Sequence, residues 1–199
     1  MTRDELFEAI GRDDTIENVD LSGIDLSGRD LSGARFEGVI FRGADFRGAK
    51  VKRTGFKGCD FTGATMEGTS LEHVLWMGMN LSGVILSGAN LDRAVLTGAD
   101  LTGATLKGAN FTRAVMDNTK IDGADLTGAN LNRTILYKAS LKGANLSGAD
   151  LFKAIFFEAD LTGSNLTGAK IHKTFLRDCN LAGQDFSGAT FTMTQAGGA

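Results

Sequence analysis

Residues Ala99 to Asn118 read ADLTG ATLKG ANFTR AVMDN, four five-residue words that follow one pattern. A small residue opens each word, and a large apolar residue stands in its third place. That third place recurs at every fifth position from Leu21 to Phe191, which makes 35 words, and every residue in it is Leu, Phe, Ile, Val, Met or Trp. Such a fixed period predicts a repeat architecture in which each unit packs on its neighbours.

The composition of a word predicts how it folds. Its first and third residues point to the same side of an extended segment, so the small and the large side chain lie inside and the polar second residue lies outside. Of the 27 glycines, 23 stand in the fifth place, which marks that place as a corner. A period of five fits neither a long strand nor a helix, and it favours a short strand followed by a turn.

The fifth places that lack glycine give the length of one coil. Seven of them carry basic residues at intervals of 20: Arg53, His73, Arg93, Arg113, Arg133, Lys153 and Lys173. Apolar residues in the second place show the same interval: Leu75, Val95, Val115, Ile135, Ile155 and Phe175. Four words therefore make one coil, and the array is predicted to be a rod of nearly nine coils, roughly 42 Å long at the spacing of stacked strands.

The words ANLDR, ANFTR, ADLTG, ANLSG and ADLFK resemble the pentapeptide-repeat family, over about nine-tenths of the chain. The resemblance implies an all-β fold, a right-handed quadrilateral β-helix in which the third residue of each word fills the core. The resemblance also suggests that this chain shares two properties of family members related to fluoroquinolone resistance. They form dimers through their C-terminal ends, and they imitate duplex DNA to bind DNA gyrase.

The ends of the chain differ from the repeat. Residues 1–18 are predicted to form a short capping helix and a lead-in, because Thr2 and Glu5 make a capping box and Leu6, Phe7 and Ile10 share one face. The solenoid is predicted over 19–193, and the segment 194–199 is expected to be disordered. The acidic start MTRDELFEAI lacks the features of a signal peptide, and no apolar run is long enough to span a membrane, so a cytoplasmic protein is expected.

The basic residues of the fifth place and the apolar residues of the second place are expected to lie side by side on one face. We call these thirteen residues the stripe, and we call its seven basic members the basic ladder. A row of six apolar groups facing solvent beside seven basic residues is typical of a protein-binding surface. A purely structural role is the alternative, because stacked β-branched side chains stabilise neighbouring strands and Asp92, Asp117 and Glu158 could offset the cations.

A second interface is expected at the C-terminal end, where the last coil has no lid. Phe186, Phe191 and Met193 are its candidate residues, and a homodimer is the expected assembly.

The sequence favours a protein without catalytic activity, cofactor or metal. The outside of the rod offers no concave site, and two isolated histidines with two cysteines 120 residues apart do not make a metal site. We therefore expect a scaffold that binds another protein of unknown identity. The alternative is DNA mimicry and gyrase binding, although the acidic residues form no continuous row. Direct nucleic-acid binding is disfavoured by a net charge of −3.

Overall fold

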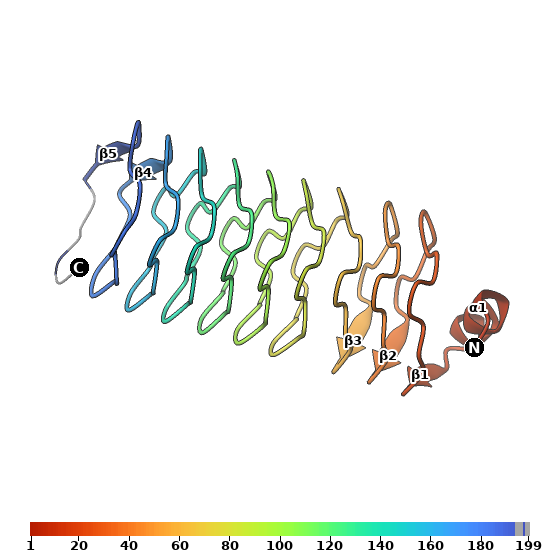
Figure 1. The fold of residues 1–199 in the computed structure, drawn as a ribbon. Helices are drawn as coiled ribbons and strands as arrows, with labels where there is room; N and C mark the ends of the chain where they lie inside the picture. Colours follow the sequence, from red (N-terminus) through yellow and green to blue (C-terminus); the bar gives the residue numbers. More distant parts are fainter. Residues whose placement is uncertain (194–196, 198–199) are drawn as a thin grey trace.

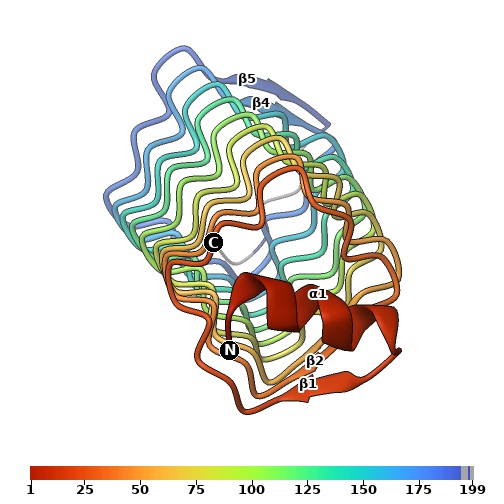
Figure 2. The ribbon, with the colours of Figure 1, turned by 90° about the vertical axis from the view of Figure 1, so that its right-hand side faces the viewer.

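The computed structural model describes residues 1–193 and 197. It is an elongated stack of coils with a helix across its N-terminal end (Figures 1 and 2). The helix and the strands are α1 (Arg3–Gly11), β1 (Thr15–Glu17), β2 (Arg35–Glu37), β3 (Gly55–Lys57), β4 (Lys170–His172) and β5 (Thr190–Thr192).

Each coil contains 20 residues, as the interval of the exceptions predicted. The strands β1, β2 and β3 pair in parallel, with Ile16 opposite Phe36 and Phe36 opposite Phe56. The strands β4 and β5 pair with the same offset. Along much of the rod the strand on each side is so short that it forms a single bridge, such as Asp100 with Lys120. Four such sides close one coil, because the second places of four successive words each bridge to the next coil.

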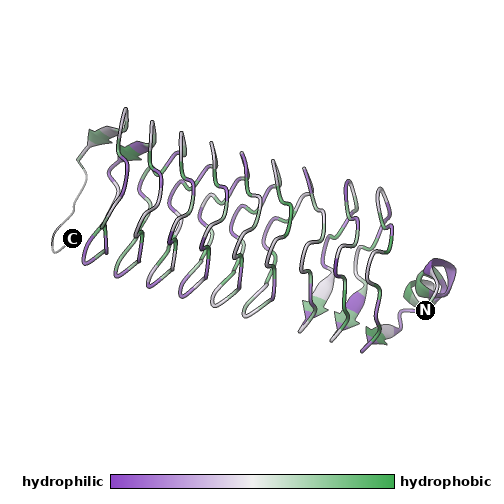
Figure 3. Ribbon diagram, in the orientation of Figure 1, coloured by the Kyte–Doolittle hydropathy of each residue, from purple (hydrophilic) through white to green (hydrophobic). Residues whose placement is uncertain are grey.

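The core holds the first and third residues of most words. Figure 3 shows hydrophobic and hydrophilic residues alternating along the coils. Every third-place residue from Ile16 to Leu176 is buried. Threonine replaces alanine at a few first places, and there the hydroxyl donates to a carbonyl of the preceding coil. Thr134 Oγ1, for example, donates to the Phe111 oxygen at 2.8 Å. The two cysteines also occupy first places, where burial raises the pKa of each thiol to about 11.

The helix α1 covers the first coil, as its sequence predicted. Thr2 Oγ1 accepts a hydrogen bond from the Glu5 backbone, and the Glu5 carboxylate accepts one from the Thr2 backbone, so the capping box is formed. Leu6 is fully buried, and Phe7 and Ile10 pack partly buried against the core. Arg29 lies 5.5 Å from the centre of the Phe7 ring, so a first-place residue that is too large for the core contacts the cap instead.

The predicted disordered segment 194–199 lies outside the described residues except for Gly197, whose carbonyl accepts a hydrogen bond from the Asp178 backbone at 3.0 Å. In the described part of the chain, no helix has the length and apolar character needed to cross a membrane.

Candidate functional site

The basic ladder occupies one corner of the rod. Its seven residues all adopt the left-handed backbone conformation, with φ between 56° and 59° except for 55° at Lys173. The glycines of the other corners adopt the same conformation. From His73 to Lys173 each ladder N–H donates to a carbonyl of the following coil, as Arg113 does to Asn132 at 2.9 Å. The ladder side chains are therefore held in a column by the stacking of the coils.

This conformation makes a cationic corner less favourable than a glycine corner. A left-handed conformation costs a residue other than glycine roughly 1–2 kcal/mol, which is partly offset by the greater flexibility of glycine in the unfolded chain. Two corners of this rod carry glycine in every coil from Gly23 to Gly188. The corner with the ladder instead keeps basic residues against this backbone preference.

We expect Arg113→Gly to leave the free energy of unfolding unchanged or to raise it by up to about 1 kcal/mol. The matched change Gly103→Arg should lower it by about 1 kcal/mol, because φ at Gly103 is 65°. An added Cβ at Gly103 meets no atom within 4 Å, so crowding does not contribute. Urea unfolding of both variants measures the difference. A loss in Arg113→Gly as large as that in Gly103→Arg would show that the arginine side chain stabilises the fold.

Most ladder side chains point into solvent with few partners. Arg93 Nε lies 3.6 Å from an Asp92 carboxylate oxygen. The ammonium groups of Lys153 and Lys173 lie 5.1 Å and 6.0 Å from the centre of the Phe152 ring. Among residues 1–193, no ion pair involves Arg53, His73, Arg113 or Arg133.

The acidic residues expected to offset the ladder mostly contact other groups. Asp117 accepts a hydrogen bond from the Tyr137 backbone at 3.3 Å, and Glu158 pairs with Lys138 at 3.4 Å. Only Asp92, of the three acids expected to offset the ladder, pairs with a ladder residue. The ladder is therefore largely uncompensated at close range.

The apolar row of the stripe is less exposed than the six solvent-facing groups that the sequence predicted. Leu75 is 68% exposed, whereas Val95, Val115, Ile135, Ile155 and Phe175 are half-buried. From Leu75 to Phe175, each residue of the row forms a parallel β-bridge with its equivalent in the neighbouring coil, so neighbouring side chains partly cover one another. Leu75 is not covered on one side, because the equivalent residue of the preceding coil is Gly55, which has no side chain. Met77 is 63% exposed, and the Phe157 and Phe175 rings lie 6.2 Å apart on the same side of the rod.

The candidate residues at the C-terminal end are partly exposed. Phe186 is half-buried, Phe191 is 48% exposed and Met193 is 79% exposed. The Phe186 and Phe191 rings lie 5.6 Å apart. This end thus presents a small apolar surface.

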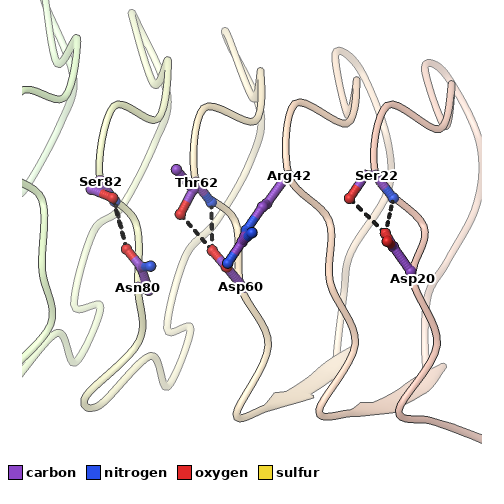
Figure 4. Close-up of polar contacts among 7 residues, drawn as sticks. All are labelled: Asp20, Ser22, Arg42, Asp60, Thr62, Asn80 and Ser82. Carbon is purple, nitrogen blue, oxygen red and sulfur yellow. Dashed lines mark hydrogen bonds and ion pairs between the residues drawn. The ribbon is translucent and has the colours of Figure 1, made fainter.

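The acidic residues of the other faces have a structural task. Asp20 Oδ1 accepts hydrogen bonds from the Ser22 backbone at 2.9 Å and from its hydroxyl at 2.6 Å. Asp60 accepts the same pair from Thr62, and Asn80 accepts it from Ser82 (Figure 4). An amide oxygen therefore accepts the same two hydrogen bonds as a carboxylate oxygen in this turn.

Basic residues neutralise several of these carboxylates. Arg42 Nε lies 2.7 Å from a carboxylate oxygen of Asp60. Figure 4 shows the Arg42 side chain reaching the Asp60 carboxylate. Elsewhere Lys107 pairs with Asp125 at 3.2 Å and Lys142 pairs with Asp160 at 3.3 Å. The acidic faces therefore carry less uncompensated charge than their aspartates suggest.

Stability is expected to fall in acid because these carboxylates are hydrogen-bonded. The hydroxyl and then the backbone of Ser22 lower the pKa of Asp20, and the Thr162 hydroxyl lowers the pKa of Asp160 against the effect of burial. Burial raises the pKa of Asp60, but hydrogen bonds from Thr62 and Arg42 outweigh it and lower the pKa. An aspartate whose pKa in the folded chain lies below the unfolded value of about 3.9 adds to the free energy of unfolding above that pH. This contribution is lost as the pH falls through the pKa of the folded chain.

Urea midpoints between about pH 6 and pH 3 measure this loss. Asp100 Oδ1 likewise accepts a hydrogen bond from the Thr102 backbone at 3.0 Å, and its pKa is lowered although burial raises it. Changing Asp20, Asp60, Asp100 and Asp160 to asparagine keeps the turn that Asn80 uses, so the variant should show a flatter pH dependence. An unchanged slope would contradict a role for these four carboxylates.

One group of residues at the ladder corner was not among the predicted site residues. Lys50, Lys52, Val51, Phe56 and Trp76 line a cleft of about 910 Å³ together with the ladder residues Arg53 and His73. The five-residue pattern gives no signal for a cleft. The sequence does hold two irregularities there, the single tryptophan and the glycine at position 55, one coil before the apolar row begins at Leu75. Among the described residues, no three His, Cys, Asp or Glu side chains are placed to hold a metal ion.

The geometry defines a four-sided β-solenoid built from five-residue units. The family described as pentapeptide repeats matches in eight overlapping copies, at residues 20–58, 40–75, 59–98, 77–113, 94–133, 134–172, 144–183 and 164–199. The chain belongs to the pentapeptide-repeat family. The fold that the sequence resemblance implied is thereby confirmed.

Solved structures are similar to this chain along most of its length. HetL, a pentapeptide repeat protein involved in heterocyst differentiation regulation from the cyanobacterium Nostoc sp. strain PCC 7120, is 27% identical over 98% of this chain and 94% of its own, with a TM-score of 0.37. A trypsin-treated form of QnrB1, a plasmid-mediated fluoroquinolone resistance protein, is 21% identical over 89% of this chain and 91% of its own, with a TM-score of 0.64. The likeness to QnrB1 supports the fold alone. No curated protein gives a significant match.

Proposed function

We propose that this chain is a non-enzymatic scaffold that binds another protein through the stripe. The observation that carries the proposal is the basic ladder, a column of basic residues with few acidic partners at a corner where glycine suits the backbone better. The half-buried apolar row lies beside it and offers area that a partner can cover. Cations next to apolar groups are typical of the residues that protein interfaces use.

The scaffold is held rigid by its backbone. Hydrogen bonds of 2.7–3.0 Å join each coil to the next along the central part of the rod, for example from Leu91 to Asn110 and from Arg93 to Thr112. A partner that binds such a column meets an ordered surface, so little conformational entropy is lost on binding.

A capture experiment with an unfolding control tests the stripe. The full chain is used as bait in a cell extract beside the variant Arg93→Gly, Arg113→Gly and Arg133→Gly. Because glycine suits these corners, the variant should remain folded and lose the partner. The control changes Lys107, Lys120 and Lys142 on other faces to serine and should retain it. Capture by the ladder variant at the level of the unchanged chain would refute the proposal.

The C-terminal apolar surface supports a homodimer. Phe191 and Met193 expose apolar area that a second copy can cover, and the end of a solenoid presents unpaired strand groups. Sedimentation should find a dimer for the unchanged chain and a monomer for Phe191→Glu. The control Phe152→Glu, on the side of the rod, should remain dimeric. A monomer at all concentrations of the unchanged chain would exclude this assembly.

DNA mimicry with binding to DNA gyrase is the second candidate. The rod shape supports it (Figure 1), but the ion pairs of Asp60, Asp125 and Asp160 neutralise carboxylates that would have to imitate phosphates. A gyrase supercoiling and drug-protection assay separates the candidates. Inhibition or protection by this chain would favour mimicry over the scaffold, and neither effect is expected.

A further inference from the structure

The coils are separated along two sides of the rod, between residues 49–58 and residues 69–78. In the coil before this point, the Leu31 N–H donates to Lys50 at 2.8 Å, and in the coil after it the Leu71 N–H donates to Asn90 at 2.7 Å. Between the two segments themselves, no backbone hydrogen bond joins the equivalent groups. The N–H groups of Val51, Arg53, Phe56 and Gly58 on one wall, and of Ser70 and Leu75 on the other, make none of the expected bonds across the gap.

The other two sides of the same coils remain joined. Phe41 donates to Asp60 and Phe46 donates to Thr65, each at 2.7 Å. The coils therefore open as a wedge, and the ribbon in Figure 1 is visibly spread between β3 and the coil that follows it.

An aromatic contact explains the opening. Phe36 and Phe56, in coils that are fully paired, stack at 5.4 Å with their rings 8° apart. Phe56 and Trp76 are the next pair in the same column, and they meet edge to face at 72° with centres 6.3 Å apart. An edge-to-face pair along the rod axis needs more height than a stacked pair. The indole of Trp76, which is 1% exposed, thus holds the walls apart from inside.

The cleft of about 910 Å³ has an apolar floor and a cationic rim. The third-place residues Val51, Phe56 and Trp76 line it together with the basic residues Lys50, Lys52, Arg53 and His73. Of these, Lys50 pairs with Asp30 at 3.9 Å. Glu72 is the acidic residue of the lining, and its carboxylate accepts a hydrogen bond from the Asn90 side chain at 2.5 Å. The volume lies within the range of ligand sites.

We propose that this cleft binds an extended acidic segment of a partner protein, which enters as an additional β-strand between the two coils. Both walls offer N–H and C=O groups that make no backbone hydrogen bond across the gap, and a polypeptide backbone is the ligand that pairs with both kinds of group at once. The cations of the rim select carboxylates on the segment. This inference deepens the proposed scaffold function and rests on it, since the segment belongs to a protein partner.

Hydrogen exchange of the free protein tests the cleft before any ligand is added. The amides of Val51, Arg53 and Phe56 should exchange at least about 100-fold faster than those of Leu91, Arg93 and Leu96, which hold the same places two coils later. Equal protection of the two sets would show that the walls are closed in solution and would overturn the proposal.

A capped heptapeptide of alternating glutamate and valine is the binding probe. Trp76 is the single tryptophan of the chain, so its fluorescence reports on the cleft directly. The peptide should change the fluorescence and slow exchange at Val51, Arg53 and Phe56. The same peptide with N-methylated backbone amides should not bind. Equal binding of both peptides would show that the peptide binds through its charges and not through its backbone N–H groups. That result would refute strand insertion.

Charge-reversal variants locate the peptide. Lys52→Glu with Arg53→Glu should weaken binding at least about tenfold. The matched control Lys120→Glu with Lys142→Glu reverses two charges on other faces of the rod, outside both the cleft and the stripe, and should change binding less than about twofold. Failure of the unchanged chain to bind the peptide sinks this inference and leaves the capture experiment intact, because Arg93, Arg113 and Arg133 lie outside the cleft lining.

Discussion

Phe111→Ala is expected to lower the free energy of unfolding by about 3–5 kcal/mol. Phe111 is fully buried in the third place of its word, and its backbone carbonyl accepts the hydrogen bond from Thr134 of the next coil. Removing the ring leaves a cavity that the stacked coils cannot close, because their spacing is fixed by backbone hydrogen bonds on every side.

The control is Phe152→Ala, which removes the same ring from the outside of the rod. Phe152 is half-buried, so a loss of about 1 kcal/mol is expected. Urea unfolding followed by circular dichroism measures both changes. Similar losses in the two variants would contradict the assignment of third-place residues to the core.

Deleting a single residue should be far more harmful than deleting a whole coil. Without Gly103, the downstream coils stack out of register by one residue, which turns apolar side chains outward at the junction. The C-terminal half of the rod should then lose its cooperative unfolding transition. Without residues 99–118, Gly98 is followed directly by Thr119 and every word keeps its side of the rod. That variant should unfold cooperatively with only one coil interface fewer.

A five-residue deletion of 104–108 gives an intermediate case. The frame of the words survives, so the core still stacks, but all later words move to the neighbouring side of the rod. Thermal melting of the three deletions gives their order. Survival of the chain without Gly103 at the level of the chain without residues 99–118 would contradict the stacking by words.

The sequence predicts most of this fold because the structure repeats with the same period as the sequence. The 20-residue coil follows from the spacing of Arg53 to Lys173, and the buried core follows from the third places. The capping helix follows from the Thr2 and Glu5 pair and its apolar face. Each of these features depends on residues close in the chain or at a fixed offset.

The features that escaped prediction depend on how particular side chains meet. The half-burial of Val95 and Val115 comes from neighbours that cover them at the spacing of one coil. The cleft comes from the edge-to-face contact of Phe56 with Trp76, and both residues fit the third-place pattern equally well. A pattern that accepts any large apolar residue cannot distinguish a stacked ring pair from one that spreads the coils.

The central claim is that one continuous face of the rod binds a partner, and capture by two deletion variants tests it most directly. Deletion of 99–118 removes one ladder residue and keeps the other six in one column, so the chain should still capture the partner. Deletion of 104–108 leaves all seven basic residues but divides them between two corners, and capture should be lost although the chain is folded. Equal capture by both folded variants would contradict the claim.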